Sequence, residues 1–384
     1  MQFEFATASR IRFGNGAVKD LPQAAAELGH SILFVMGESR QRRAEQIEAL
    51  RAAGLAVAEY HVVGEPTVQV VLTGLEQARS AGCDVVIGMG GGSVLDTGKA
   101  IAALLRNPGD VLDYLEVVGK GLPLPNASAP YVAVPTTAGS GSEVTRNAVL
   151  MVAEKRLKVS LRSAYLLPRL ALVDPELTYS LPAAQTANSG MDALTQVIEP
   201  LLTRVPTPLT DAVCREGITR IARALERAHR NGKDREARED MSAGSLMGGM
   251  ALANAKLGAV HGFAGPLGGM YSAPHGGICA RLLPIVMEAN LRALRERGGK
   301  GSQLDRFSEV ARLLTGKPDA NAEDGIRWLR ELAVALHIPG LSTYGVKASE
   351  FGDVIDRARR SSSMKGNPVE LSDAELRAIL EAAL

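Results

Sequence analysis

The chain has 384 residues, which is enough for two domains of ordinary size with substantial hydrophobic cores. Apolar residues make up 46% and charged residues 22%, proportions that are typical of a globular protein. The formal net charge of +1 gives no electrostatic reason to bind nucleic acid or an acidic membrane, so we expect neither as a partner.

The cysteines and the apolar segments indicate the cellular setting. Cys83, Cys214 and Cys279 form no CxxC pair and are odd in number, which favours a reducing, cytoplasmic setting. The N-terminal stretch lacks a basic region followed by an apolar one, so we expect no signal peptide. Residues 241–255 contain no Asp, Glu, Lys or Arg, but the segment is short and rich in Gly and Ala. It therefore predicts a buried helix rather than a membrane span.

The first half of the chain alternates short apolar runs with amphipathic stretches, a pattern that predicts strands alternating with helices. Such alternation with short turns favours a parallel sheet covered by helices on both faces. The expected strands are 31–36, 56–63, 84–88, 131–134 and 170–173, and the expected helices are 40–53, 68–81 and a third that follows Ser93 to about Leu105.

The second half has almost only helical patterns. We place the domain boundary between Asp174 and Gln185, which gives an α/β domain over 1–182 and an all-helical domain over 183–384. Ser372 followed by Glu375 predicts a capping box at the start of the last helix. The expected helices are 209–229, 235–254, 304–314, 325–336, 349–361 and 372–383.

A glycine-rich turn joins a buried strand to a helix at Gly90, Gly91, Gly92 and Ser93. Glycines let the backbone approach a bound group closely, and the start of the following helix favours an anion. The pattern is not GxGxxG, so the ordinary dinucleotide fingerprint does not apply. A tight turn without a ligand is the alternative.

A second polar loop, PTTAGSGSEVT, spans residues 135–145 and follows another expected strand. Its hydroxyls and backbone N–H groups suit a phosphate or a ribose. We expect the strand before it to end beside Gly90, at the carboxyl edge of the sheet where ligands bind. The alternative is a flexible surface loop.

Four residues of the second half form a candidate metal site. Asp192 and Gln196 are four residues apart, which places both on one face of a helix, and His261 and His275 follow in a segment rich in Gly, Ala and Pro. A carboxylate and two imidazoles suit zinc or ferrous iron, with the Gln amide oxygen as a weaker fourth ligand. A single histidine, however, is more often a hydrogen-bonded structural residue.

Five ordered motifs together resemble the iron-containing, or group III, alcohol dehydrogenases. The resemblance runs from about Phe13 to near Pro368. The motifs are GGGSVLDTGKA (90–100), PTTAGSGSEVT (135–145), LVDPELTYSLP (172–182), GMDALTQVIEP (190–200) and GAVHGFAGPLGGMYSAPHG (258–276).

The resemblance implies a dehydroquinate synthase-like architecture: an N-terminal dinucleotide-binding α/β domain, a helical C-terminal domain and a site in the cleft between them. It implies that Asp192, His261 and His275 bind a metal, Fe²⁺ or Zn²⁺, and carry the catalysis. The cofactor contacts that it implies are the phosphate loop Gly90, Gly91, Gly92 and Ser93 with Asp96, the loop residues Thr136, Thr137 and Ser142, and Lys158 as the lysine of the strand before the DP turn.

Two positions depart from the family's pattern. The family usually has DALTH, with the histidine as a metal ligand, where this chain has Gln196. It usually has HGxAHPLG, with a second histidine near the nicotinamide, where this chain has Gly265. A neutral amide oxygen binds iron or zinc less strongly than imidazole does, and glycine cannot relay a proton.

The stretch after the first long strand bears on the choice between NAD and NADP. Many NAD-preferring relatives have an Asp there that binds the ribose hydroxyls, whereas this chain has Gly37, followed by Ser39 and three arginines up to Arg43. A small residue with nearby cations accepts a 2′-phosphate, so we expect NADPH to be preferred over NADH. Against this, Glu38 is adjacent and a basic run that starts a helix is often solvated.

The function implied is an NAD(P)-dependent oxidoreductase that interconverts an alcohol and an aldehyde or ketone by metal-assisted hydride transfer. We expect a small-molecule alcohol, aldehyde or keto-acid substrate and a homodimer. The alternatives are a metal-independent enzyme resembling maleylacetate reductase, a lyase resembling dehydroquinate synthase, and a non-catalytic nucleotide-binding protein with a decayed site.

Overall fold

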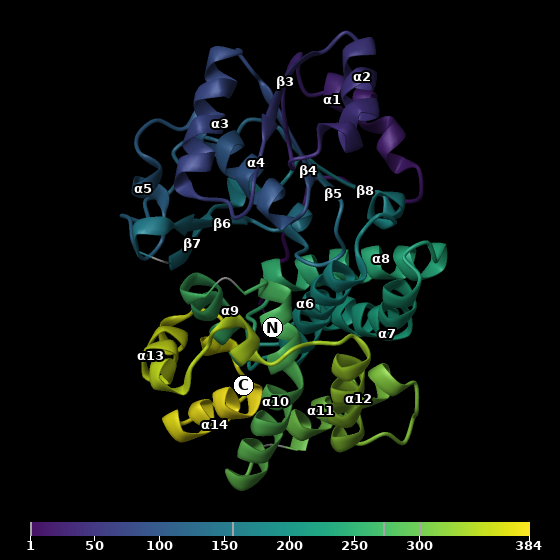
Figure 1. Cartoon of the computed structure of the whole chain (residues 1–384), viewed down its shortest axis with the longest axis vertical. Helices are drawn as coiled ribbons and strands as arrows, with labels where there is room; N and C mark the ends of the chain where they lie inside the picture. The colour runs from purple at the N-terminus through teal and green to yellow at the C-terminus, as the bar shows by residue number, and fades with distance from the viewer. Residues whose placement is uncertain (1, 156, 272, 300) are drawn as a thin grey trace. The chain divides into compact units, whose positions relative to one another are not determined.

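A computed structural model describes residues 2–155, 157–271, 273–299 and 301–384 (Figure 1). The chain divides into two compact units, and its main passage from one to the other lies between Thr178 and Tyr179. The α/β unit comprises Ala6–Thr137 and Gly141–Thr178. The helical unit comprises Tyr179–Leu384 together with two short segments, Met1–Phe5 and Ala138–Ser140.

Six strands of the described residues form one parallel sheet in the α/β unit, in the order β1-β8-β5-β4-β2-β3. Parallel pairing requires a crossover between neighbouring strands, and helices supply most of these crossovers. The strand bounds are Ile11–Phe13 for β1, Ser31–Met36 for β2, Ala56–His61 for β3, Val85–Gly90 for β4, Tyr131–Pro135 for β5 and Leu170–Val173 for β8.

The sheet is buried on both faces, as its alternating side chains show. In β2, Ile32 and Phe34 join one hydrophobic cluster, with α1 (Leu21–Ala26) and α2 (Ala44–Ala52). Leu33 and Val35 join a second cluster on the opposite face, with α3 (Val68–Ser80) and α4 (Gly92–Arg106). Figure 1 shows these two pairs of helices on opposite sides of the strands. The predicted parallel sheet covered on both faces is confirmed.

The sequence patterns missed several elements of the α/β unit. An antiparallel hairpin joins β6 (Asn147–Val152) to β7 (Leu157–Arg162), outside the main sheet. The short edge strand β1 and the short helices α1 and α5 (Val111–Tyr114) were also not predicted. The helix expected over 40–53 begins as a 3-10 turn, Arg40–Arg43, before α2.

Strands β2 and β4 are neighbours in the sheet, but the chain continues from them in opposite directions. Strand β3 lies on the far side of β2, and β5 lies on the far side of β4. In open parallel sheets, ligands bind outside the carboxyl ends of the strands at such a reversal. Here β2 ends at Met36, directly before Gly37, and β4 ends at Gly90. The two stretches that the sequence analysis assigned to the dinucleotide therefore begin at this edge.

The described part of the helical unit contains no strand, in agreement with the sequence patterns. The predicted bounds of α8 are confirmed, as is the Ser372–Glu375 capping box of α14. None of the described helices is long and apolar enough to cross a membrane. The helices are α6 (Ala183–Leu202), α7 (Pro208–Arg230), α8 (Arg235–Asn254), α9 (Ala259–Met270), α10 (His275–Glu296), α11 (Gly301–Thr315), α12 (Ala322–Ala335), α13 (Phe351–Arg360) and α14 (Asp373–Ala383).

Candidate functional site

Helix α6 carries three polar side chains on one buried face. Asp192, Gln196 and Glu199 are spaced by four and three residues, so the helical repeat brings them into line. All three are nearly inaccessible, with 6%, 2% and 7% of their surface exposed. Buried carboxylates and amides require partners, so this face of α6 must meet polar groups of other helices or a ligand.

The two histidines stand at the starts of the helices that meet α6. His261 is the third residue of α9, and His275 is the first residue of α10. A side chain at Gly276 would place its Cβ 2.1 Å from the backbone oxygen of Asn188 on α6. Glycine at that position therefore lets α10 approach α6 closely enough to bring His275 to Asp192.

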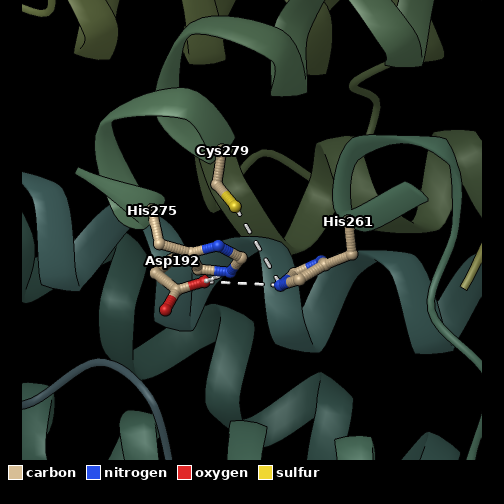
Figure 2. Close-up of side chains that lie close together, drawn as sticks. All are labelled: Asp192, His261, His275 and Cys279. Atoms are coloured by element: carbon tan, nitrogen blue, oxygen red, sulfur yellow. Dashed lines mark hydrogen bonds and ion pairs between the residues drawn. The ribbon is translucent and has the colours of Figure 1, made fainter. Parts of the chain in front are cut away.

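Four side chains converge at this point (Figure 2). Asp192 Oδ1 lies 3.3 Å from His261 Nε2 and 3.8 Å from His275 Nε2. The Sγ atom of Cys279, one turn after His275 on α10, lies 4.0 Å from His261 Nε2. One candidate ligand atom from each of the four residues lies within 4.8 Å of every other.

Glu199 fixes the orientation of His261. Its Oε2 lies 2.6 Å from His261 Nδ1, and its Oε1 accepts a hydrogen bond of 2.7 Å from the backbone N–H of Val260. An ionised carboxylate only accepts, so Nδ1 carries the proton and Nε2 is turned toward Asp192. A carboxylate behind the distal nitrogen is a common arrangement for histidines that bind metals.

The pKa values of the cluster reflect this mutual stabilisation. Burial opposes ionisation of Asp192, but the adjacent His275 and His261 imidazoles outweigh it and hold the pKa of Asp192 below its ordinary value. Burial likewise disfavours the imidazolium of His261, but Cys279 and Asp192 together raise its pKa well above the ordinary value. Burial also opposes protonation of His275, and Cys279 and Asp192 again raise the pKa overall. The site therefore attracts positive charge.

The donor set fits a divalent cation. Among the described residues, Gln196 Oε1 is buried without a hydrogen-bond partner, and the buried Asp192 Oδ1 meets only the two histidine nitrogens, at 3.3 Å and 3.8 Å. Leaving such atoms unpaired costs about 1–3 kcal/mol each, and a cation would satisfy the carboxylate oxygen. A carboxylate and two imidazoles are ligands that zinc and ferrous iron accept.

Two residues of this cluster, Glu199 and Cys279, were not predicted from the sequence. Glu199 lies seven residues after Asp192, and Cys279 lies four residues after His275, so each shares a helical face with a predicted residue. That spacing is a usable signal. It was insufficient by itself because α6, α9 and α10 bring these residues together only through tertiary packing.

The phosphate loop predicted at residues 90–93 lies at the carboxyl end of β4. Gly91 is the N-cap of α4 and provides no side-chain cap, so the first N–H groups of that helix are available to an anion. The backbone N–H of Thr136 donates to Gly90 O at 2.9 Å, which joins the polar loop to this edge as predicted. A Cβ at Gly91 would lie 3.3 Å from Thr137 Cγ2.

Two predicted cofactor contacts, Asp96 and Ser142, bind each other. Ser142 Oγ donates to Asp96 Oδ1 at 2.5 Å, and the backbone N–H of Val149 donates to Asp96 Oδ2 at 3.0 Å. Lys99, 1% exposed, donates from Nζ to Ser142 O, Thr145 Oγ1 and Asn147 O at 2.6–2.9 Å. The loop is therefore anchored to α4 rather than being a flexible surface loop.

Lys158 lies on β7, whereas the strand that precedes the DP turn is β8, so that detail of its predicted placement was wrong. Its Nζ pairs with Glu65 Oε2 at 2.9 Å.

Gly37 has no atom within 4 Å of where a Cβ would stand, and Ser39 is exposed. Arg40 pairs with Glu59 at 2.7 Å. The roles of these residues in cofactor binding stay predictions.

Comparison with known families covers nearly the whole chain. The family profile "Iron-containing alcohol dehydrogenase" matches residues 8–175. The profile "Fe-containing alcohol dehydrogenase family, C-terminal" matches residues 186–384.

Individual relatives agree with the profiles. The 1,3-propanediol dehydrogenase of Klebsiella pneumoniae is 38% identical over 341 residues, which cover 87% of this chain and 85% of that protein. A crystal structure of a 1,3-propanediol oxidoreductase superposes with a TM-score of 0.93 at 34% identity, covering 100% of both chains. The sulfoacetaldehyde reductase of Bifidobacterium kashiwanohense, solved in complex with NAD⁺, superposes with a TM-score of 0.87 at 28% identity, covering 100% of this chain and 99% of that one.

Proposed function

Because the chain belongs to the iron-containing alcohol dehydrogenase family and is an oxidoreductase that interconverts alcohols and aldehydes, we propose that it works with a nicotinamide dinucleotide and a divalent cation. The two halves of the chain have different roles. Residues 1–182 bind the dinucleotide, and residues 183–384 hold the cation.

Asp192, His261 and His275 are the proposed metal ligands, and they are also the catalytic residues. The observation that carries the proposal is their convergence, in which both imidazole Nε2 atoms lie within 3.8 Å of the buried oxygen Asp192 Oδ1. When bound, the cation supplies Lewis-acid polarisation of the substrate oxygen. Asp192 offsets its charge, and Glu199 keeps His261 Nε2 directed toward it.

The two departures from the family's motifs define what the remaining residues can do. Gln196 is a neutral donor, so we assign it a weak or outer role, in which its unpartnered Oε1 accepts a hydrogen bond from a bound hydroxyl or water. Gly265 lies one helical turn after His261, and no atom lies within 4 Å of where its Cβ would stand. We therefore propose that the protons released in alcohol oxidation leave through water beside Gly265 rather than through a side chain.

The dinucleotide is assigned to the carboxyl edge of the parallel sheet. Its pyrophosphate would lie at Gly90, Gly91, Gly92 and Ser93, where the uncapped N-terminus of α4 favours an anion. Thr136 and Thr137 adjoin this turn, which supports the assignment of their hydroxyls to phosphate or ribose. Asp96, Ser142 and Lys158 stay predicted contacts.

Substituting Gly91 tests the phosphate loop. Gly91→Val should weaken dinucleotide binding about tenfold or more, because its side chain would fill the space beside Thr137 that a phosphate needs. The measurement is quenching of intrinsic fluorescence on titration with NAD(P)H. Gly352→Val, at a helical position where no atom lies within 4 Å of the added Cβ, should bind as the wild type does. Equal binding by both variants would contradict the assignment.

We propose NADPH over NADH. Gly37 leaves open space at the end of β2, and Arg42 is exposed without a carboxylate partner among the described residues. Arg40 is a poorer candidate for the 2′-phosphate because Glu59 and Glu48 occupy its guanidinium. Arg42→Ala should therefore lower kcat/KM for NADPH about tenfold and leave the value for NADH nearly unchanged, whereas Arg40→Ala should change the ratio little. A wild type that prefers NADH would contradict this part of the proposal.

The names of the relatives support a substrate class. We propose a small alcohol and its aldehyde as the substrate pair, since relatives act on propane-1,3-diol and on sulfoacetaldehyde. We also propose a homodimer, to be tested by light scattering, and a cytoplasmic location. The three cysteines of the chain are free thiols, as expected in a reducing compartment.

Metal analysis with an activity screen tests the function as a whole. Purified protein, stripped with a strong chelator and then reloaded with Fe²⁺ or Zn²⁺, is assayed by nicotinamide absorbance against alcohols, aldehydes and keto acids. We expect activity to disappear with the metal and to return with it. Full activity in a preparation shown to contain no metal would contradict the proposal and favour a metal-independent reductase.

A further inference from the structure

Cys279 is positioned like a ligand, although nothing in the family's motifs assigns it a role. It lies one turn after His275 on α10, so both side chains leave the same face of that helix. Its thiol is fully buried, and Figure 2 shows it directed at the point where Asp192, His261 and His275 meet. Its Sγ belongs to the group of atoms that all lie within 4.8 Å of one another.

The distances are close to those of a tetrahedral site. Bond lengths to zinc imply that two ligand atoms of one tetrahedron stand about 3.4 Å apart for nitrogen and oxygen and about 3.6 Å apart for nitrogen and sulfur. Asp192 Oδ1 lies 3.3 Å and 3.8 Å from the two imidazole nitrogens, and Cys279 Sγ lies 4.0 Å from His261 Nε2. These three pairs lie within about 0.4 Å of the expected values, and the remaining pairs lie within 4.8 Å, so modest side-chain rotations would complete the tetrahedron.

We propose that the Cys279 thiolate is the fourth protein ligand of the cation, in the place of the imidazole that Gln196 does not provide. This inference rests on the proposed metal site and adds the chemical identity of its donor set: one carboxylate, two imidazoles and one thiolate. Thiolate is a softer donor than an amide oxygen or a carboxylate, and such a mixed N/S/O set favours zinc over ferrous iron. Zinc can also expand to five ligands, which leaves a position for an exchangeable oxygen.

Cys214 provides an internal control. It is as fully buried as Cys279 and belongs to the same hydrophobic cluster, but it lies on α7, outside the group of candidate metal ligands, and burial raises the pKa of its thiol. A buried cysteine that binds no metal behaves as a small apolar side chain. The contrast between the two cysteines therefore separates metal ligation from packing.

Cobalt substitution tests the ligation directly. Cobalt(II) is added to the metal-free protein, and its binding is followed by metal analysis and by the visible d–d absorption. We expect the wild type and Cys214→Ala to develop a near-ultraviolet band from sulfur-to-cobalt charge transfer. Cys279→Ser and Cys279→Asp should lack that band, and Cys279→Asp should still bind cobalt because its carboxylate can ligate.

The outcomes that overturn the inference are distinct from those that overturn the metal site. Bound cobalt without the charge-transfer band in the wild type would refute sulfur ligation and leave the metal site standing. A band that persists in Cys279→Ser would refute the assignment to Cys279. Failure of the folded wild type to bind cobalt, zinc or iron would refute both proposals.

Metal selectivity gives a second, independent measurement. Anaerobic protein equilibrated with equal concentrations of Zn²⁺ and Fe²⁺ should retain mostly zinc. Cys279→Ser should weaken zinc binding by about tenfold or more, because even the loss of a partner behind a ligand costs this much, and should affect iron less. Unchanged zinc-to-iron selectivity in Cys279→Ser, with Cys214→Ala as the matched control, would contradict the inference.

Discussion

The two units of the molecule each contain a buried polar cluster, and the clusters differ in how their hydrogen-bonding groups are satisfied. In the α/β unit, Lys99 Nζ donates to three oxygens, and both oxygens of Asp96 accept hydrogen bonds. In the helical unit, Gln196 Oε1 has no hydrogen-bond partner among the described residues, and Asp192 Oδ1 meets only the two histidine nitrogens, at 3.3 Å and 3.8 Å. The first cluster is complete without a ligand, whereas the second is not.

The difference has a physical consequence. Leaving a buried polar group without a partner destabilises the fold by more than a satisfied hydrogen bond stabilises it. Folding stability alone therefore does not explain why the polar residues of the Asp192 cluster are buried together. A cation that joins Asp192 and the two histidines would remove that cost. The Lys99 cluster instead ties the loop after β5 to helix α4, which makes it part of the scaffold that presents the phosphate loop.

His275→Ala should have the largest effect, because it removes one of only two imidazole ligands. We expect loss of the bound metal and a fall in kcat/KM of about 10³-fold or more, equivalent to roughly 4 kcal/mol of transition-state stabilisation. Metal analysis and steady-state kinetics measure the two effects. His337→Ala, at an exposed position of the same unit, is the matched control and should leave both unchanged. If His275→Ala retains both metal and activity, the Asp192 cluster does not hold a catalytic cation, and it no longer differs from the Lys99 cluster in needing a ligand.

Lys99→Met should act on stability instead. It leaves Asp96 without its buried cation and removes three hydrogen bonds, so we expect a loss of about 3–5 kcal/mol in the free energy of unfolding. Chemical denaturation followed by circular dichroism measures it. Arg40→Met removes solvent-exposed ion pairs with Glu59 and Glu48, and should lower the free energy of unfolding far less than Lys99→Met does. The metal content of folded Lys99→Met should equal that of the wild type, since this cluster does not hold the cation.

The sequence predicted the elements that depend on local patterns and missed those that depend on packing. Strand β2 and helix α8 were predicted to the residue because an unbroken apolar run and a capped helical pattern are local signals. The β6–β7 hairpin was missed although its pattern is local: β6, NAVLMV, is a short apolar run, and β7, LKVSLR, alternates apolar and polar residues. Spacing also cannot show whether a hydroxyl such as that of Ser142 faces a ligand or binds Asp96. The same limit hid Glu199 and Cys279, whose partners lie on other helices.

Glu143→Gln should make stability depend less on pH. Burial raises the pKa of Glu143 to about 7, and its own backbone N–H and Lys99 offset this only in part. A carboxyl whose pKa is higher in the folded state stabilises the fold below its unfolded pKa, and that contribution is lost as the pH rises to about 7. The wild type should therefore lose about 2–3 kcal/mol relative to Glu143→Gln between pH 5 and pH 8. Parallel denaturation curves at the two pH values measure the difference, and a constant difference would show that Glu143 is ionised in the fold throughout.

Ser142→Ala should give the smallest effect, and it decides between two roles for this hydroxyl. The structure uses Ser142 Oγ as a donor to Asp96, so removing it should cost about 1.5 kcal/mol of stability. Ser128→Ala is the matched control in the same unit. The Oγ of Ser128 is buried without a hydrogen-bond partner among the described residues, so its removal should be neutral or slightly stabilising.

Kinetics with the same pair of variants complete the test. If Ser142 acts only through Asp96, the KM for the dinucleotide should change less than about twofold in Ser142→Ala, because the anion-binding N–H groups of α4 remain. A cofactor contact would show the reverse, with unchanged stability and a KM raised about tenfold by the loss of a hydrogen bond to the bound nucleotide. The second result would place Ser142 among the residues that bind the cofactor, and the α/β cluster would then share with the Asp192 cluster the property of meeting a ligand.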